Sequence, residues 1–326
     1  MSYEQKRSEL IYLIKGLACF LVICAHCNSV GADAGVVAKY SSLFIQHISK
    51  YGVPCFFVLS GFLFKSGESM GGFLFKKIKR LCIPWVISAT VVYLYVYLRK
   101  PPVSLLTWIW FVMGRSSYCY YMTVLMMIYA IFTIFPQIKK DILLYICIII
   151  TAVSSAYAYK YFPELYLNIF NWIGYFAGGV LIRNKEEWFR NMFSKVISMR
   201  FFVYAAAVLV IAIQFYRNIV PEYWGWQCYI EIVLGTFVII ILAKRIMDTG
   251  ILRKFWKKVG VKSFWIYLWH MPVAGLIANI MNRGILQPLV LIRPVIVLLI
   301  TYFSGILLEY FAKRLKMTKL LKYVGL

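Results

Sequence analysis

Two ionisable residues in the first apolar stretch have the types and the spacing to act together chemically. Lys15 and His26 are separated by ten residues, none of them charged. In an α-helix, eleven steps make about three turns, which places both side chains on one face, about 16 Å apart along the axis. Ionisable groups facing hydrocarbon are costly, so we expect the pair to face a polar cavity inside a helix bundle. Taken singly, each residue would also fit the membrane interface.

The second apolar stretch carries a polar stripe in its first half. His47, Lys50 and Pro54 lie at i, i+3 and i+7, which is one face of a helix, and Pro54 is expected to kink it. We expect this stripe to line an outward cavity; a re-entrant or interfacial start to the helix is the alternative. Ser60 and Gly61 follow, a pair that by itself is typical of helix packing.

Two further groups of polar residues could bind ligands. Ser263, Tyr267 and His270 lie at i, i+4 and i+7, which is one face of a helix, expected in the inner half of the membrane. The alternative is that these residues only pack between helices and have no chemical role. The other group, here called the basic cluster, either binds phosphate groups or belongs to an amphipathic interfacial helix. It consists of Lys76, Lys77, Lys79 and Arg80.

The composition predicts an all-α integral membrane protein that positions these residues. Of 326 residues, 62% are hydrophobic, which exceeds the usual content of soluble domains, and the apolar runs are continuous rather than alternating. The connections are too short for a second folded domain, so residues 1–326 are expected to form one transmembrane domain. Ten helices of membrane-spanning length are expected near 9–29, 42–64, 81–99, 117–136, 141–158, 165–182, 201–216, 227–243, 263–282 and 290–312.

The positive charge follows the expected topology. The formal net charge is +24, and most Lys and Arg residues lie in the N-terminus, the even-numbered loops and the C-terminus. The positive-inside rule therefore predicts a multi-pass protein of the cell membrane with both termini in the cytoplasm. Contact with anionic lipid headgroups explains the basic surplus, and no nucleic-acid partner is expected. The eight cysteines form neither a disulfide framework nor a metal-ligand pattern.

Taken together, these segments resemble the acyltransferase-3 family, bacterial transmembrane O-acyltransferases that modify cell-surface glycans. Its motifs are similar to four segments here in chain order: Lys15–His26, Phe56–Phe62, the basic cluster with Pro84, and Ser263–Pro272. The resemblance covers essentially the whole chain. Two departures stand out. The family usually has arginine where this chain has Lys15, which keeps the charge without the bidentate geometry. The segment 120–125 lacks the family's Ser-Leu-x-x-Glu pattern and is closer to the short stand-alone sugar acetylases.

The resemblance implies an acyl-CoA co-substrate, acetyl-CoA first, bound from the cytoplasm, and no permanently bound cofactor. The acceptor would be a hydroxyl of a surface polysaccharide or its lipid-linked precursor, as in exopolysaccharide biosynthesis. His26 is expected to act as general base or transient acyl carrier, and Lys15 to hold the donor or stabilise developing charge. The basic cluster would meet the CoA phosphates. The channel wall and acceptor side would include Ser60, His47, Lys50, Ser263, Tyr267 and His270.

Two other functions fit the same residues. Polar stripes in opposite halves of the membrane would also suit a transporter or flippase for a lipid-linked sugar, although the sequence shows no internal repeat. An enzyme-like remnant that only binds a partner is a third interpretation, which Lys15 in place of arginine leaves open. The glycan, the hydroxyl modified, the acyl group and the oligomeric state are left open.

Overall fold

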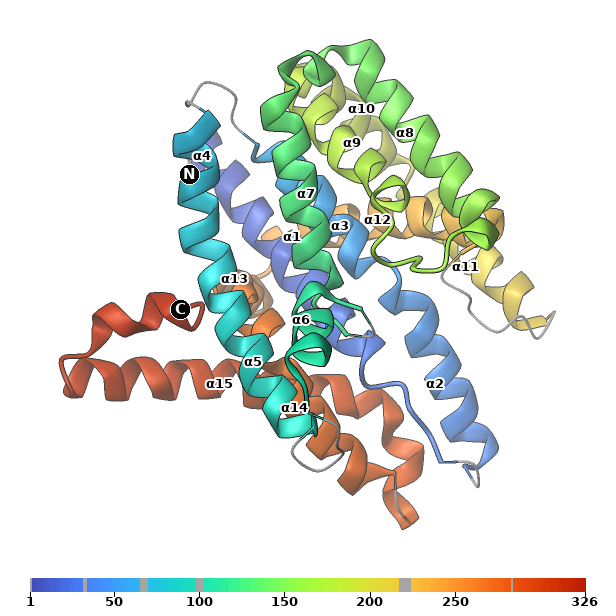
Figure 1. The fold of residues 1–326 in the computed structure, drawn as a ribbon. Coiled ribbons are helices and arrows are strands. Elements are labelled where there is room, and N and C mark those ends of the chain that lie inside the picture. The colour runs from blue at the N-terminus through green and yellow to red at the C-terminus, as the bar shows by residue number, and fades with distance from the viewer. Residues whose placement is uncertain are drawn as a thin grey trace.

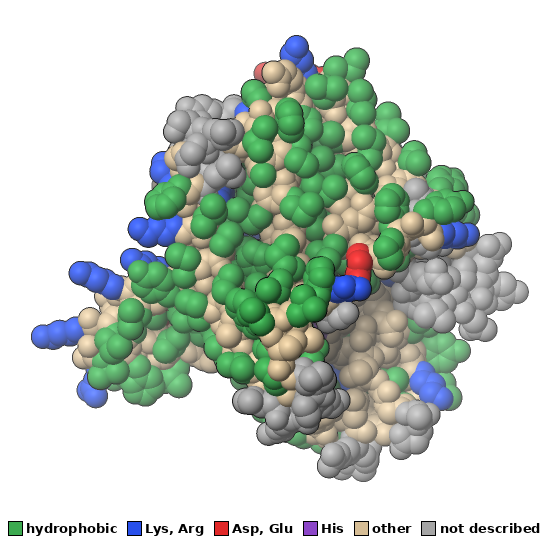
Figure 2. All heavy atoms as spheres, viewed as in Figure 1, with side chains coloured by type: hydrophobic (Ala, Val, Ile, Leu, Met, Phe, Trp, Pro, Cys, Tyr) green, Lys and Arg blue, Asp and Glu red, His purple; other side chains and the backbone are tan. Residues whose placement is uncertain are grey.

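The fold is built from apolar helices. The computed structural model describes residues 2–31, 34–64, 70–97, 103–115, 117–216, 224–282 and 284–326, and these ranges contain helices and no strand. Among them, four helices are long and apolar enough to cross a membrane: Tyr3–Ala25, Phe75–Tyr97, Ser263–Met281 and Leu286–Arg314. Apolar side chains cover most of the face in Figure 2, as on a surface that meets lipid. An all-helical membrane protein is thus confirmed, whereas ten spans and cytoplasmic termini stay predictions.

Figure 1 shows the order of the helices along the chain. Their bounds are α1 Tyr3–Ala25, α2 Val36–Ser49, α3 Gly52–Phe62, α4 Met70–Lys77, η1 Ile78–Cys82, α5 Ile83–Tyr97, α6 Leu105–Met113, α7 Tyr120–Ile134, η2 Pro136–Lys139, α8 Asp141–Ala156, η3 Ala158–Tyr161, η4 Ile169–Asn171, α9 Ile173–Asn184, α10 Glu186–Ser198, α11 Arg200–Tyr216, α12 Trp226–Met247, α13 Ile251–Val261, α14 Ser263–Met281, η5 Gly284–Ile292, α15 Arg293–Arg314 and η6 Thr318–Tyr323.

Helix α1 is the central element of the fold. It begins at a capping box, in which the Ser2 hydroxyl accepts from the Gln5 amide and the Gln5 side chain accepts from the Ser2 amide. From Leu13 onwards it is apolar on nearly all sides, which is typical of a helix enclosed by others. It contacts α2, α3, α12, α13, α14 and α15. The helix ends at Ala25, and His26 is its C-cap residue.

The expected second span, 42–64, is two helices rather than one. Helix α2 ends at its C-cap Lys50, Tyr51 is the N-cap of α3, and α3 then continues to Phe62. The kink predicted at Pro54 is therefore a break that precedes it. Pro54 lies in the first turn of α3, where its missing N–H leaves no hydrogen bond unmade. The break places Lys50 and Tyr51 side by side at the helix junction.

Helices α3 and α9 pack backbone against backbone. A Cβ atom on Gly61 would lie 1.9 Å from the Phe176 carbonyl oxygen, and one on Gly179 would lie 2.0 Å from the Val58 oxygen. Small residues allow such close approach in membrane helices. Gly178, in contrast, faces open space. Ser60, next to Gly61, is thereby held at a fixed depth in the bundle.

The expected sixth span, 165–182, starts with irregular backbone. Helix α9 begins only at Ile173, after the short turn η4. The buried amide of Asn171 explains the difference, because its Nδ2 donates to the Leu165 oxygen (2.9 Å) and its Oδ1 accepts from Ser154 Oγ (2.6 Å). The Asn171 side chain thus satisfies the Leu165 carbonyl, a backbone group that a regular helix would bond within its own ladder. The resulting loop covers one end of the bundle and contributes residues to the cavity described next.

Candidate active site

A cavity of about 530 Å³ lies at the C-terminal end of α1. Its walls come from α1, α2, α3, α14, the N-terminal end of α7 and the loop before η4. The size falls within the range of small-molecule sites, and the lining combines aromatic rings with a few polar groups, as such sites do. On the face shown in Figure 2, a hollow free of green side chains lies near α2 and α6. The polar and aromatic residues of the wall include His26, Asn28, Gln46, Ser49, Lys50, Ser117, Tyr118, Tyr120, Tyr121, Glu164, Tyr166 and Tyr267.

Two histidines from opposite ends of the sequence meet at this cavity. The rings of His26 and His270 have centroids 5.2 Å apart, with their planes inclined by 46°. The Tyr118 ring packs edge-on against both, at 6.5 Å and 5.6 Å. His26 lines the cavity, whereas His270 is fully buried behind it. The structure thus brings together two of the residues that the sequence singled out separately.

The hydrogen bonds of His270 define its neutral tautomer. Its Nδ1 lies 2.7 Å from the Tyr267 oxygen and 3.1 Å from the Ile266 oxygen. Carbonyl oxygens only accept hydrogen bonds, so Nδ1 carries the proton and Nε2 keeps a lone pair in the neutral ring. Within the described part of the chain, Nε2 is buried and has no hydrogen-bond partner. A basic nitrogen is therefore available beside the His26 ring.

Reciprocal hydrogen bonds hold α14 in this register. Tyr267 Oη donates to the Tyr118 oxygen (2.8 Å), and Tyr118 Oη donates to the Leu268 oxygen (3.1 Å). Ser263, the first residue of α14, is also buried, but it lies outside the cavity; its carbonyl accepts from the Cys19 thiol at 3.7 Å. The predicted stripe on α14 therefore contributes Tyr267 to the wall and His270 behind it, and uses Ser263 for packing against α1.

Lys15 and the basic cluster lie away from the cavity. Lys15 does not line it; its ammonium is 5.6 Å from the centroid of the Tyr12 ring and is subject to the charge of Arg80. Lys76 and Lys77 end α4, and Lys79 and Arg80 lie in the π-helical turn η1 that joins α4 to α5. Such turns are frequent at functional sites. The segment from Phe75 onwards is one continuous helix with α5, and Lys76, Lys79 and Arg80 are exposed at its surface.

Hydroxyl groups connect the basic cluster to the cavity. Lys77 Nζ lies 4.7 Å from the centroid of the Tyr129 ring, which is also subject to the charge of Arg80. The Ser60 hydroxyl interacts with Tyr129 and lies 3.5 Å from the Tyr121 hydroxyl, and Tyr121 lines the cavity. The sequence analysis did not single out the tyrosines of α7 and missed this arrangement. Only their contact with Ser60 distinguishes them, and that contact depends on how α3 and α7 pack.

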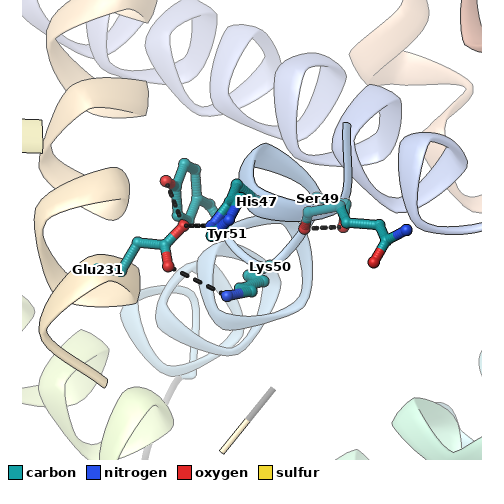
Figure 3. Close-up of polar contacts among 6 residues, drawn as sticks. His47, Ser49, Lys50, Tyr51 and Glu231 are labelled. Carbon is teal, nitrogen blue, oxygen red and sulfur yellow. Dashed lines mark hydrogen bonds and ion pairs between the residues drawn. The ribbon is translucent and has the colours of Figure 1, made fainter. Parts of the chain in front are cut away.

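The polar residues of the helix break converge on one buried carboxylate (Figure 3). Glu231 Oε1 accepts from His47 Nδ1 (3.0 Å) and from Tyr51 Oη (3.1 Å), and Oε2 pairs with Lys50 Nζ (3.1 Å). Exposed fractions of 0% for His47, 1% for Lys50 and 2% for Glu231 show how completely the group is enclosed. Lys50 borders the cavity but His47 does not, so the expected outward stripe lines the cavity only in part. The sequence analysis did not single out Glu231, which lies far along the chain from His47 and Lys50.

The comparisons with known proteins identify the family. A family model described as an acyltransferase domain matches residues 10–312, which include all the residues that line the cavity. Neither a search of curated proteins nor a search of solved structures returned a match. The matched range agrees with the resemblance carried by the four sequence motifs, and the apolar helices identify the chain as a membrane protein. This chain belongs to the acyltransferase-3 family and is a membrane acyltransferase.

Proposed function

We propose that this acyltransferase moves an acetyl group from acetyl-CoA to a hydroxyl of a cell-surface polysaccharide or its lipid-linked precursor. The observation that carries the proposal is the position of His26, which lines a cavity of ligand size and has a second histidine in ring contact. The basic cluster, with Lys15 nearby, lies apart from that cavity and would bind the donor. Donor and acceptor would thus approach the reacting atoms from two sides.

The chemistry requires one base and one proton path. The acceptor oxygen attacks the thioester carbonyl, a C–O bond forms, and the C–S bond to CoA breaks. His26 takes the proton of the acceptor hydroxyl during attack and returns it to the departing thiolate. A neutral imidazole suits both steps near pH 7. The proton of the acceptor hydroxyl thus ends on the CoA thiol, and the step needs no further reactant.

His270 would orient the base. Its Nε2 lone pair can accept an N–H from His26, so that the other nitrogen of His26 presents its lone pair to the acceptor. A base oriented by a third group is the usual arrangement where a side chain must activate a hydroxyl. The contacts of Tyr118 with both rings would restrict their rotation. His270 is accordingly a positioning residue, and His26 is the catalytic one.

The basic cluster would hold the phosphates of CoA. Lys76, Lys79 and Arg80 are exposed near the N-terminal end of the continuous helix Phe75–Tyr97, where they would reach a soluble donor, and arginine adds bidentate contacts to phosphate. The distribution of Lys and Arg favours placing this end, and both chain termini, in the cytoplasm. The cavity would then open toward the other side of the cell membrane, where the glycan is presented.

The test is acetyl transfer by the purified protein in lipid nanodiscs, with radiolabelled acetyl-CoA and surface glycan from a strain that lacks the gene. CoA release that depends on the glycan separates an acyltransferase from a carrier of lipid-linked sugar. His26→Ala should lower the rate by about 10²–10⁴-fold with unchanged expression and thermal stability. Normal acetylation by that variant would refute the assignment of His26.

A further inference from the structure

The charges around the cavity are balanced in pairs. Among the described residues, the lysine and carboxylate side chains that line it are Lys50 and Glu164. Each forms an ion pair with a residue that does not line the cavity: Lys50 Nζ lies 3.1 Å from Glu231 Oε2, and Glu164 Oε1 lies 2.7 Å from Arg115 Nε. Lys50 lies at the α2–α3 junction and its partner on α12, whereas Glu164 lies in the loop before η4 and its partner just after α6. The cavity therefore holds both signs of charge without a net surplus of either.

The pair at the helix break is already fully engaged (Figure 3). Glu231 receives hydrogen bonds from His47 and Tyr51 in addition to Lys50. A neutral imidazole suffices for the bond from His47, so the group need not carry excess charge. A lysine buried to 1% exposure and tied to a carboxylate cannot turn to a second anion without giving up that buried ion pair. Lys50 is thus a poor receptor for an acidic ligand.

The rest of the polar lining consists of uncharged donors and acceptors. Asn28, Gln46 and Ser49 contribute amide and hydroxyl groups, and the tyrosines add hydroxyls. The Tyr120 and Tyr166 rings are in contact, with centroids 4.9 Å apart and planes inclined by 48°, and both line the cavity wall. Hydroxyl-rich ligands satisfy such a set of groups by neutral hydrogen bonds, and their C–H surface packs against the rings.

We propose that the cavity selects an uncharged sugar ring as acyl acceptor and discriminates against the corresponding acidic sugar. A carboxylate that enters this cavity would lose its hydration and find both cations already paired, which is unfavourable. This inference rests on the proposed function only for the role of acceptor; the preference itself is a property of binding. It specifies the substrate class, which family membership leaves open.

Binding of matched glycosides tests the preference. The probes are methyl glucoside with methyl glucuronide, and methyl galactoside with methyl galacturonide, titrated into the protein in nanodiscs and followed by saturation-transfer NMR. Each neutral member should bind at least tenfold more tightly than its acidic counterpart. Equal or tighter binding of the acidic members, or no binding of either neutral member, would overturn the inference. Bound neutral glycosides that accept no acetyl group would instead contradict the proposed function.

Charge variants at the exposed pair test the cause. Glu164 and Arg115 have side-chain exposures of 44% and 49%, so replacing either should leave the fold intact. At low salt, where screening is weak, Glu164→Gln should raise the acidic-to-neutral binding ratio about three- to tenfold, and Arg115→Gln should lower it. Glu187→Gln, an exposed acid on α10 outside the cavity, should leave the ratio unchanged. Shifts of the same sign in the first two variants, or none, would refute the charge-balance argument.

Discussion

Replacing Glu231 by glutamine should destabilise the protein strongly. The substitution keeps the size of the side chain and removes its charge, and with it the ion pair at 3.1 Å to the Lys50 ammonium, which is 1% exposed. The hydrogen bonds from His47 and Tyr51 to the carboxylate are weakened as well. Removing one member of a buried ion pair costs about 3–5 kcal/mol. At roughly 2 °C per kcal/mol for a chain of this size, the Tm should fall by about 6–10 °C.

A companion double variant separates the charge from the packing. Lys50→Met combined with Glu231→Leu removes both charges and fills the space with apolar groups, which in buried pairs is often neutral or stabilising. Its Tm should lie well above that of Glu231→Gln alone. The exposed pair Arg115–Glu164 supplies the control, because Glu164→Gln should change stability by at most about 1 kcal/mol.

The buried cysteines provide the assay. Cys19, Cys24, Cys55 and Cys228 are free thiols with almost no exposure, so a thiol-reactive fluorophore reports unfolding of the protein in detergent during a thermal ramp. A Tm for Glu231→Gln within 2 °C of wild type, with the control variant behaving as expected, would refute the reasoning. It would mean that Lys50 reaches water or another anion in the folded protein.

Three further predictions concern packing, positioning and donor binding. Gly179→Ala should lower stability by about 1–3 kcal/mol in the same thermal assay, because its Cβ would meet the Val58 oxygen, whereas Gly178→Ala should be tolerated. His270→Ala should lower kcat about ten- to a hundredfold with an unchanged KM for acetyl-CoA, and His270→Gln, which keeps an acceptor, should recover part of it; a raised KM alone would contradict a positioning role. Arg80→Gln should raise the KM for acetyl-CoA about tenfold. The control Lys319→Gln removes a basic residue outside the cluster and should leave this KM unchanged; equal effects of the two variants would argue against a specific phosphate site.

The sequence alone predicts an all-helical membrane protein and singles out His26 as the candidate base at the cavity. Backbone groups in hydrocarbon must be satisfied within the segment, so long apolar runs dictate helices, and the structure confirms them. Helix geometry predicted Lys15 and His26 on one face; the structure places Lys15 within α1 and His26 at its C-cap, and of the two only His26 lines the cavity. The order of four motifs along the chain sufficed for the family, which the family match confirms.

Only the tertiary structure shows which residues meet. His26 contacts His270, and Glu231 joins His47, Lys50 and Tyr51, across long stretches of chain. The helix break at Lys50–Tyr51 and the hydroxyl contacts of Ser60 were equally hidden. The reason is that helical periodicity determines which side chains share a face, but the neighbour of that face depends on how helices far apart in sequence pack together. Gly61 and Gly179 allow α3 to pack closely against α9, and the contact of α1 with α14 places His270 beside His26.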